Sequence, residues 1–186
     1  MELDASLRLR LAQALGQAQK RGWVGKKQLD SYIDHSLGFA RVMHLVPEVA
    51  VDLGSGGGLP ALVLMAVWPK CRWTLVEVSL ARAALLELNC VRLGWADRVE
   101  VCHADAHSLI GDVGFVGCAD LVTARSFGPA ETVVAAAAPL LRQGGELIVS
   151  AAPDADPWSD VMLVAHGLAP DQVTSTKPRF HHTRKL

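Results

Sequence analysis

The chain has 186 residues, of which 51% are hydrophobic, and its formal net charge at pH 7 is −1. This length and composition predict a single globular domain with a sizeable core, and the near-neutral total excludes a uniformly basic nucleic-acid-binding chain. The longest apolar run, from Leu59 to Trp68, contains Pro60 and is too short to span a bilayer. The N-terminus carries acidic residues before its basic ones and has no apolar signal region, so we expect a cytoplasmic protein without a membrane segment.

The elements begin with two helices. Apolar residues at helical spacing predict a helix over residues 3–20 and a second over about 27–44, and together they form an N-terminal helical extension over 1–46. From Val49 onward strands and helices alternate in a core covering 47–186. This order of elements is typical of an α/β domain.

The first half of this core contains three predicted strands. They are VAVDL (49–53), RWTLVEV (72–78) and RVEVCHA (98–104). Leu59 to Val67 predicts a helix with Pro60 in its first turn, where the missing N–H costs nothing. Ser79 is the expected N-cap of a helix that runs to Leu93 and ends at Gly94.

The second half completes the sheet. ADLVTAR (119–125) and GELIVSA (145–151) predict strands, with an alanine-rich helix from Pro129 to Gln143 and another over 157–167. QVTST and RFHHTRKL predict a closing hairpin. Near-continuous apolar strands alternating with helices indicate a mostly parallel, seven-stranded sheet with helices on both faces.

The charged residues are unevenly distributed. Residues 1–45 have a net charge of +3, residues 46–172 of −8 and residues 173–186 of +4. The basic ends suit a polyanion, although ordinary solvated surface explains them as well. His181 and His182 in the last segment are possible phosphate contacts, but exposed histidines in a tail usually have no such role.

The four cysteines give no sign of a metal site. They stand far apart and no CxxC pair occurs, so we expect neither zinc nor a redox motif, and we interpret them as buried reduced thiols (Cys71, Cys90, Cys102 and Cys118).

A glycine-rich loop follows the first strand of the core. Gly54 to Gly58 contains four glycines, interrupted only by Ser55. A dinucleotide-binding loop would need a third glycine where Leu59 stands, and the chain has no GK[ST] ending of a phosphate-binding loop. The pattern D-x-G-x-G-x-G that begins at Asp52 instead resembles motif I of class I S-adenosylmethionine-dependent methyltransferases, a Rossmann-like group.

That resemblance implies the rest of a cofactor site in chain order. Asp52, Gly54, Ser55, Gly56 and Gly58 form the cofactor loop, and nineteen residues after Gly58 a carboxylate ends the second strand. This carboxylate, Glu77, is expected to accept hydrogen bonds from both ribose hydroxyls. Asp105, after the third strand, is expected to meet the adenine amino group.

Several segments are similar to one narrower family, the bacterial small-subunit rRNA (guanine-N7) methyltransferases, also called glucose-inhibited division protein B. The segments are DLGSGGGLP, TLVE, TAR at the end of the fourth strand, and DHSLGFA at 34–40, within roughly residues 30–150. The family's cofactor contacts match Gly54, Leu59, Ala104, Asp105 and Arg125. The chain departs from the family at Ala61 and Ser126, and it lacks a lysine after the fifth strand.

The resemblance implies a function. The expected reaction moves a methyl group from S-adenosyl-L-methionine to guanine N7 of rRNA or of the small ribosomal subunit. That nitrogen has a free lone pair and needs no general base, so no catalytic residue is assigned, although His103 beside the site is a possible base. Two alternatives stay open: a methyltransferase acting on a small molecule or a protein, and a non-catalytic scaffold that binds the cofactor. The oligomeric state is left undetermined.

Overall fold

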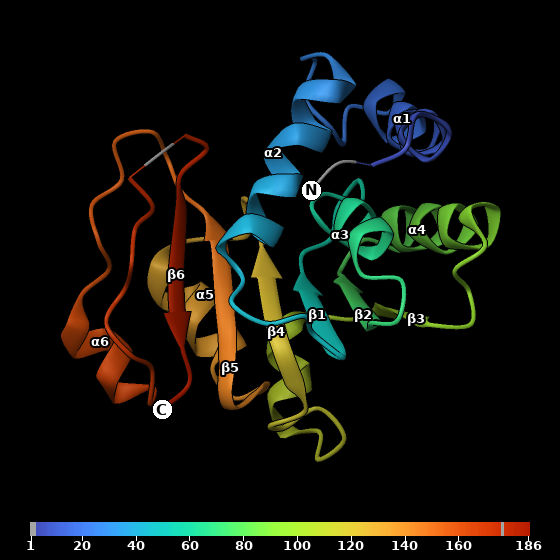
Figure 1. Cartoon of the computed structure of the whole chain (residues 1–186). Helices are drawn as coiled ribbons and strands as arrows, with labels where there is room; N and C mark the ends of the chain where they lie inside the picture. Colours follow the sequence, from blue (N-terminus) through green and yellow to red (C-terminus); the bar gives the residue numbers. More distant parts are fainter. Residues whose placement is uncertain (1–2, 176) are drawn as a thin grey trace.

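A computed structural model describes residues 3–175 and 177–186 of the chain. Within these residues one sheet of six strands has the order β3-β2-β1-β4-β5-β6 (Figure 1). Neighbouring strands are parallel, except that β6 is antiparallel to β5. The strands are β1 (Val49–Leu53), β2 (Arg72–Glu77), β3 (Val99–His103), β4 (Ala119–Ala124), β5 (Leu141–Ser150) and β6 (Phe180–Arg184).

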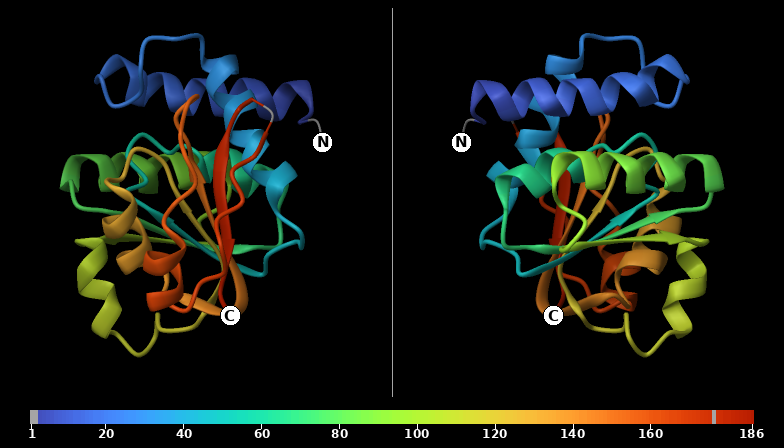
Figure 2. Two further views of the ribbon diagram at one scale, coloured as in Figure 1. Left: turned by 90° about the vertical axis from the view of Figure 1, so that its left-hand side faces the viewer. Right: turned by 90° about the vertical axis from the view of Figure 1, so that its right-hand side faces the viewer.

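Helices cover both faces of the sheet (Figure 2). One face carries α2 (Leu29–Val42), α3 (Ala61–Val67) and α4 (Leu80–Leu93), with α1 (Ala5–Lys20) packed outside them. The other face carries the 3-10 helix η1 (Ala106–Gly111), α5 (Ala130–Ala137) and α6 (Asp160–Ala165). The Rossmann-like α/β class expected from the sequence is therefore confirmed.

Alternation along the strands divides the core in two. Ala50 of β1 packs with the helices α1 to α4, whereas Val51 and Leu53, one and three residues further on, pack with α5 and α6. Successive side chains of a strand point to opposite faces, so a strand covered on both sides must be apolar at nearly every position. The run VAVDL meets that requirement with one exception, Asp52.

The helix expected from Pro129 to Gln143 is shorter in the structure. It ends at Ala137, and β5 already begins at Leu141. Pro139 explains the difference, because Ala138 still has helical backbone and donates to Val134 O at 2.9 Å, whereas proline has no N–H with which to continue the helix. The chain can therefore turn early and extend β5 beyond its expected start.

The expected seven-stranded sheet is wrong by one strand. The segment 169–174 runs beside β6 and donates Ala169 N–H to Arg184 O at 2.9 Å and Gln172 N–H to His182 O at 2.8 Å, but it forms no strand. The reciprocal backbone bonds of a ladder are replaced by side-chain contacts, because His182 N–H donates to Asp171 Oδ1 at 3.0 Å and Phe180 N–H donates to Thr174 Oγ1 at 2.9 Å. Position 176, the last residue of the expected strand, lies outside the described residues.

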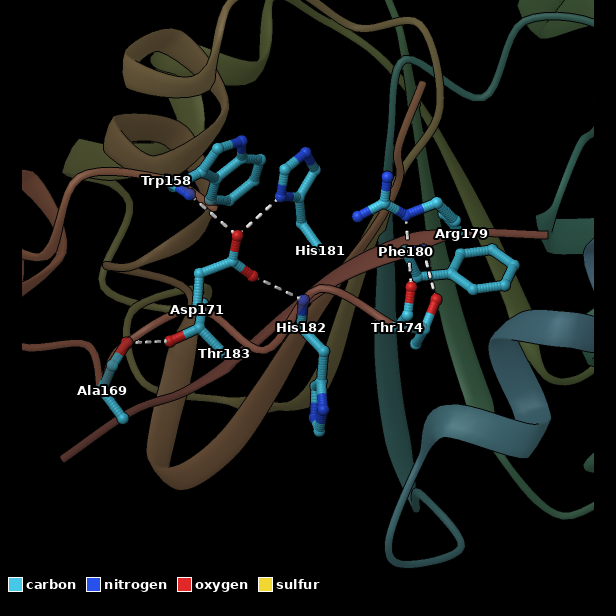
Figure 3. A network of polar contacts seen from close by, with 9 residues as sticks. All are labelled: Trp158, Ala169, Asp171, Thr174, Arg179, Phe180, His181, His182 and Thr183. Atoms are coloured by element: carbon cyan, nitrogen blue, oxygen red, sulfur yellow. Dashed lines mark hydrogen bonds and ion pairs between the residues drawn. The ribbon is translucent and has the colours of Figure 1, made fainter. Parts of the chain in front are cut away.

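Asp171 replaces part of that ladder with a buried network (Figure 3). Its carboxylate accepts hydrogen bonds from the backbone N–H groups of Trp158 at 2.9 Å and His182 at 3.0 Å, and it contacts His181 Nδ1 at 2.6 Å. The Trp158 ring stacks on the His181 ring with 4.3 Å between centroids. The expectation that His181 and His182 are exposed is wrong, because they are only 6% and 5% exposed.

No helix within residues 3–175 and 177–186 is long and apolar enough to cross a membrane.

Candidate functional site

The glycine loop leaves the carboxyl end of β1 at the centre of the sheet. Gly54, Gly56 and Gly58 have φ values of +67°, +56° and +99°. An L side chain in this left-handed region costs roughly 1–2 kcal/mol per residue, so the path of the loop itself requires glycine at three positions. The positive φ values therefore account for the alternate glycines of the motif.

Two of the loop glycines are needed for packing. A Cβ on Gly57 would lie 2.5 Å from Val24 Cγ2, and one on Gly58 would lie 2.5 Å from Leu62 Cδ1. Gly56 differs, because the only neighbour within 4 Å of its Cβ would be the carbonyl oxygen of Gly54, at 3.6 Å. Gly56 is thus the loop position at which an added side chain would meet open space.

Glu77 fastens this loop to the neighbouring strand. It ends β2, and its side chain is only 3% exposed. Glu77 Oε2 accepts the N–H of Gly56 at 2.8 Å, and Oε1 accepts the N–H of Ser79 at 2.8 Å. A guanidinium nitrogen of Arg82 lies 3.8 Å from Oε1. The carboxylate is therefore fixed in orientation while part of its acceptor capacity stays available, because a carboxylate offers about four acceptor positions.

A cavity of about 340 Å³ lies between this loop and the ends of β2, β3 and β4. Four of the residues predicted from the sequence line it, namely Gly54, Glu77, Ala104 and Asp105. Its volume falls within the range of roughly 300–1,000 Å³ that is usual for ligand sites. Residues that lie far apart in the sequence are therefore brought to one cavity at the carboxyl edge of the sheet, where α/β proteins bind ligands.

Asp105 begins the short helix η1. Its Oδ1 accepts the N–H of His107 at 2.8 Å, which satisfies one of the free N–H groups at the start of a helix. The Asp105 side chain stays exposed at the rim of the cavity. The sequence analysis identified the residue but missed η1 itself.

The cavity also has apolar walls that the sequence analysis missed. Val78, 66% exposed, and Phe127 both line it. The Phe127 ring lies so close to the loop that a Cβ on Gly54 would be 2.8 Å from Cδ2. Val78 directly follows Glu77 at the end of β2, so its position was an available signal, whereas Phe127 lies three residues beyond the end of β4 and had none.

Three predicted site residues lie behind the loop. Asp52 is 1% exposed, Ser55 1% and Leu59 5%. The Ser55 hydroxyl donates to the carbonyl oxygen of Asp52 at 3.1 Å, and Leu59 packs in the core on the α1–α4 face. These side chains support the loop from within, so any direct ligand contact would have to come from their backbone.

The Asp52 carboxylate is buried with only one of its two oxygens hydrogen-bonded to a side chain that the structure describes. Its Oδ1 accepts the Thr123 hydroxyl at 2.6 Å, whereas Oδ2 has no hydrogen-bond partner among the described residues. Burial raises the pKa of Asp52 to about 6, although the hydrogen bond from Thr123 and the charge of Arg125 act in the opposite direction. The carboxyl group therefore titrates close to neutral pH.

Arg125, the remaining predicted residue, lies outside the lining of the 340 Å³ cavity. Its guanidinium carbon sits 5.1 Å from the centroid of the Tyr32 ring, and burial lowers its pKa. Nearby, His35 Nε2 contacts the Ser150 hydroxyl at 2.9 Å, and burial together with the charge of Arg125 lowers the pKa of His35. Side chains of α2 thus meet the ends of β4 and β5 at the same edge of the sheet.

Comparison with known proteins decides the family. The family model described as rRNA small subunit methyltransferase G matches residues 9–155. The chain belongs to the rRNA small subunit methyltransferase G family. A family member from Nocardioides sp. is 38% identical over 77% of this chain, and one from Thermobifida fusca is 37% identical over 69%. The chain spans 59% and 53% of the lengths of these two relatives.

Solved structures share the fold of this family member at lower identity. TrmN from Thermus thermophilus has a TM-score of 0.63 and 19% identity, with 94% of this chain and 53% of that chain covered. An O-methyltransferase family protein from Burkholderia thailandensis has a TM-score of 0.58 and 18% identity, with 84% and 55% covered. These likenesses concern the fold, which is that of Rossmann-like methyltransferases.

Proposed function

We propose that this chain transfers a methyl group from S-adenosyl-L-methionine to an RNA base, guanine N7 in small-subunit rRNA, and that it acts in the cytoplasm on rRNA or on the small ribosomal subunit. The observation that carries the proposal is the buried Glu77 carboxylate, oriented by the Gly56 N–H and facing the same cavity as Ala104 and Asp105. Membership of the methyltransferase G family supports the RNA substrate.

The residues of the cavity fit the cofactor. Gly56 leaves bare backbone beside open space, as close approach of a ligand requires. Glu77 has acceptor positions for two sugar hydroxyls, and such charge-assisted hydrogen bonds contribute roughly 1.5–3 kcal/mol each. Val78 offers an apolar surface to a purine ring, and Asp105 beside it offers an acceptor for an exocyclic amine. A nucleoside therefore matches the polarity of the cavity lining.

The bound cofactor would supply a methyl group on a sulfonium, which is already electrophilic. The acceptor N7 carries its own lone pair, so the protein needs only to align the two centres and exclude water. The position of His103 agrees with a reaction that needs no general base. Its Nε2 contacts the backbone carbonyl of Val78 at 3.0 Å, and the residue lies outside the cavity lining. Phe127, on the loop after β4, offers an aromatic face for stacking the base, a contact worth about 1–3 kcal/mol in RNA-binding proteins.

Two measurements test the proposal in order. Calorimetry with S-adenosylhomocysteine is expected to give one binding site, and absence of heat at millimolar ligand would contradict cofactor binding. Methyl transfer from labelled S-adenosylmethionine is then measured on small ribosomal subunits prepared from cells that lack this gene. Label in 7-methylguanosine supports the rRNA substrate. Binding without label in RNA, but with label in a metabolite or protein fraction, supports the alternative methyltransferase, and binding with no turnover supports a scaffold.

A further inference from the structure

A second cluster of chemically competent side chains lies away from the methyl-transfer cavity. His44, just beyond the end of α2, meets Glu146 of β5 and His182 of β6. The His182 Nε2 atom lies 2.8 Å from Glu146 Oε2, and His44 Nδ1 lies 3.1 Å from Glu146 Oε1. One donor atom from each of the three residues falls within 4.8 Å of the other two.

Strand register explains how the cluster forms. In the antiparallel β5–β6 pair, Ile148 is opposite His182, and Glu146 is two residues before Ile148. Residues two apart on a strand share a face, so Glu146 and His182 are diagonal neighbours on the side where Ile148 packs against the α1–α4 helices. The chain leaving α2 passes over this point and adds His44.

Hydrogen bonds hold the three side chains together. Glu146 is only 2% exposed, and each of its carboxylate oxygens faces one imidazole nitrogen. An ionised carboxylate only accepts hydrogen bonds, so each facing ring nitrogen must carry a hydrogen. A cation at the centre would replace both hydrogens and receive three lone pairs.

The spacing suits a zinc-sized ion. Zinc bonds of 2.0–2.2 Å to imidazole and carboxylate in a tetrahedral arrangement separate the donor atoms by about 3.3 Å. The separations of 2.8 Å for His182 Nε2–Glu146 Oε2 and 3.1 Å for His44 Nδ1–Glu146 Oε1 end on different carboxylate oxygens and are slightly shorter than that value, and one donor atom from each residue lies within 4.8 Å of the other two, so small shifts would bring three donors to one ion. The His44 side chain is 62% exposed and has freedom to adjust.

We propose that His44, Glu146 and His182 form a Zn²⁺-binding site with its fourth coordination position open to solvent. Both histidines line a groove of about 460 Å³, which gives the ion a path of entry. Two histidines and one glutamate with a vacant position is a recurrent zinc ligand set, and imidazole also suits other first-row transition ions. The expectation of no metal site depended on cysteine spacing and took no account of these residues, which lie far apart in sequence.

The site is separate from the candidate methyl-transfer cavity, because the two linings share no residue. Zinc there would tie the end of α2 to the β5–β6 edge of the sheet. The competing explanation is that the two histidines only neutralise a buried glutamate. Arg41 and Lys177 also line the groove, and their charges oppose a cation. Direct metal binding distinguishes the two explanations.

The test uses the untagged full chain after dialysis against a chelator. Co²⁺ replaces Zn²⁺ as a spectroscopic probe, and its visible absorption is followed during titration. We expect saturation at one equivalent, displacement by Zn²⁺, and a rise in melting temperature of about 5–10 °C when Zn²⁺ is at about a hundred times its dissociation constant.

The decisive variant is His44→Ala, because an exposed side chain can be removed without unfolding the core. Loss of this ligand should raise the Co²⁺ dissociation constant at least about 100-fold, more than removal of an outer-sphere partner does. His166→Ala, outside the cluster, is the matched control and should bind as the parent does. The proposal is overturned if no saturable absorption appears, or if His44→Ala binds Co²⁺ and gains thermal stability from Zn²⁺ like the control.

Discussion

The backbone N–H of Gly56 donates to Glu77 Oε2 at 2.8 Å, and this bond joins the loop after β1 to the end of β2. One carboxylate thus both shapes the loop and faces the cavity that the loop borders. A change of charge at Glu77 should therefore affect ligand binding more than stability, because its partners are backbone groups near the protein surface.

Glu77→Gln should weaken S-adenosylhomocysteine binding about 10–100-fold. The amide keeps one acceptor oxygen, but its NH₂ group must face either the Gly56 or the Ser79 N–H, and the charge-assisted bonds to ligand hydroxyls are lost. Isothermal calorimetry measures the effect. Glu87→Gln, at an exposed position of α4, is the control and should bind normally. Equal affinity in both variants would remove Glu77 from the ligand site.

Gly56→Val should abolish ligand binding while costing only about 1–2 kcal/mol of stability. The residue has φ +56°, so a side chain is strained, and it would occupy the space left beside the loop. Gly22→Val is the matched control, since Gly22 has φ +75° and no atom within 4 Å of its Cβ position. Calorimetry and urea unfolding on both variants separate backbone strain from loss of the ligand space. Comparable binding in the two variants would contradict the assignment.

Asp52→Asn should stabilise the protein at pH 7.5 by about 1–3 kcal/mol. The pKa of Asp52 is about 6 in the folded chain, against an ordinary value of 3.8. The folded state therefore binds more protons than the unfolded state between these values, and stability falls as the pH rises from about 4 to 6. The gain from the substitution should fade as the pH is lowered to 4. Urea unfolding across that range measures it.

Asp120→Asn provides a comparison of opposite sign. Burial raises the pKa of Asp120, but hydrogen bonds from the backbone of Val49 and from the side chain of Arg142 outweigh it, and the net shift is downward. This carboxylate accepts the Val49 N–H at 2.8 Å. Its substitution should destabilise the protein at pH 7.5, and the loss should shrink as the pH falls below about 4. Equal destabilisation by Asp52→Asn would contradict the electrostatic account of Asp52.

Much of the fold was predictable because its signals are local. Apolar runs such as VAVDL give a strand with the predicted bounds, and Gly94, with φ +80°, ends α4 where expected. The order of strand ends also identifies Glu77 and Asp105 as neighbours in space. The carboxyl ends of parallel strands lie at the same edge of the sheet, however the helices pack on its faces.

The rest depended on contacts between distant segments. Phe127 lines the cavity because of the turn after β4, and nothing in its own sequence context marks it. The guanidinium of Arg125 lies over the ring of Tyr32 of α2, and the sequence could not show this contact because it depends on how α2 packs on the sheet. The loss of the seventh strand follows from a side-chain contact of Asp171, which no periodicity shows.

Arg125→Ala should reduce RNA binding at least about tenfold while lowering stability by no more than about 1 kcal/mol. Its contact with the Tyr32 ring contributes only about 0.5–1 kcal/mol, and the guanidinium is the cationic group that α2 and β4 hold at this edge. Filter binding to small-subunit rRNA and urea unfolding measure the two effects. Tyr32→Leu, which removes the ring and keeps the charge, is the control. RNA affinity unchanged in Arg125→Ala would make this contact purely structural.

Asp171→Ala should lower the free energy of unfolding by about 3–5 kcal/mol, because three buried groups lose their hydrogen-bond acceptor at roughly 1–3 kcal/mol each. The carboxylate is fully buried against His181, and it also accepts the backbone N–H groups of Trp158 and His182 (Figure 3). Its removal leaves these donors without a partner beside an edge where the regular ladder is already interrupted. Amide hydrogen exchange at His182 should therefore accelerate more than exchange in β1.

The control is Asp156→Ala, at an exposed loop position, which should change the free energy of unfolding by less than about 0.5 kcal/mol. If the two variants unfold alike and β6 exchanges as slowly as before, the edge is held by the backbone contacts of residues 169–174 and the carboxylate is dispensable.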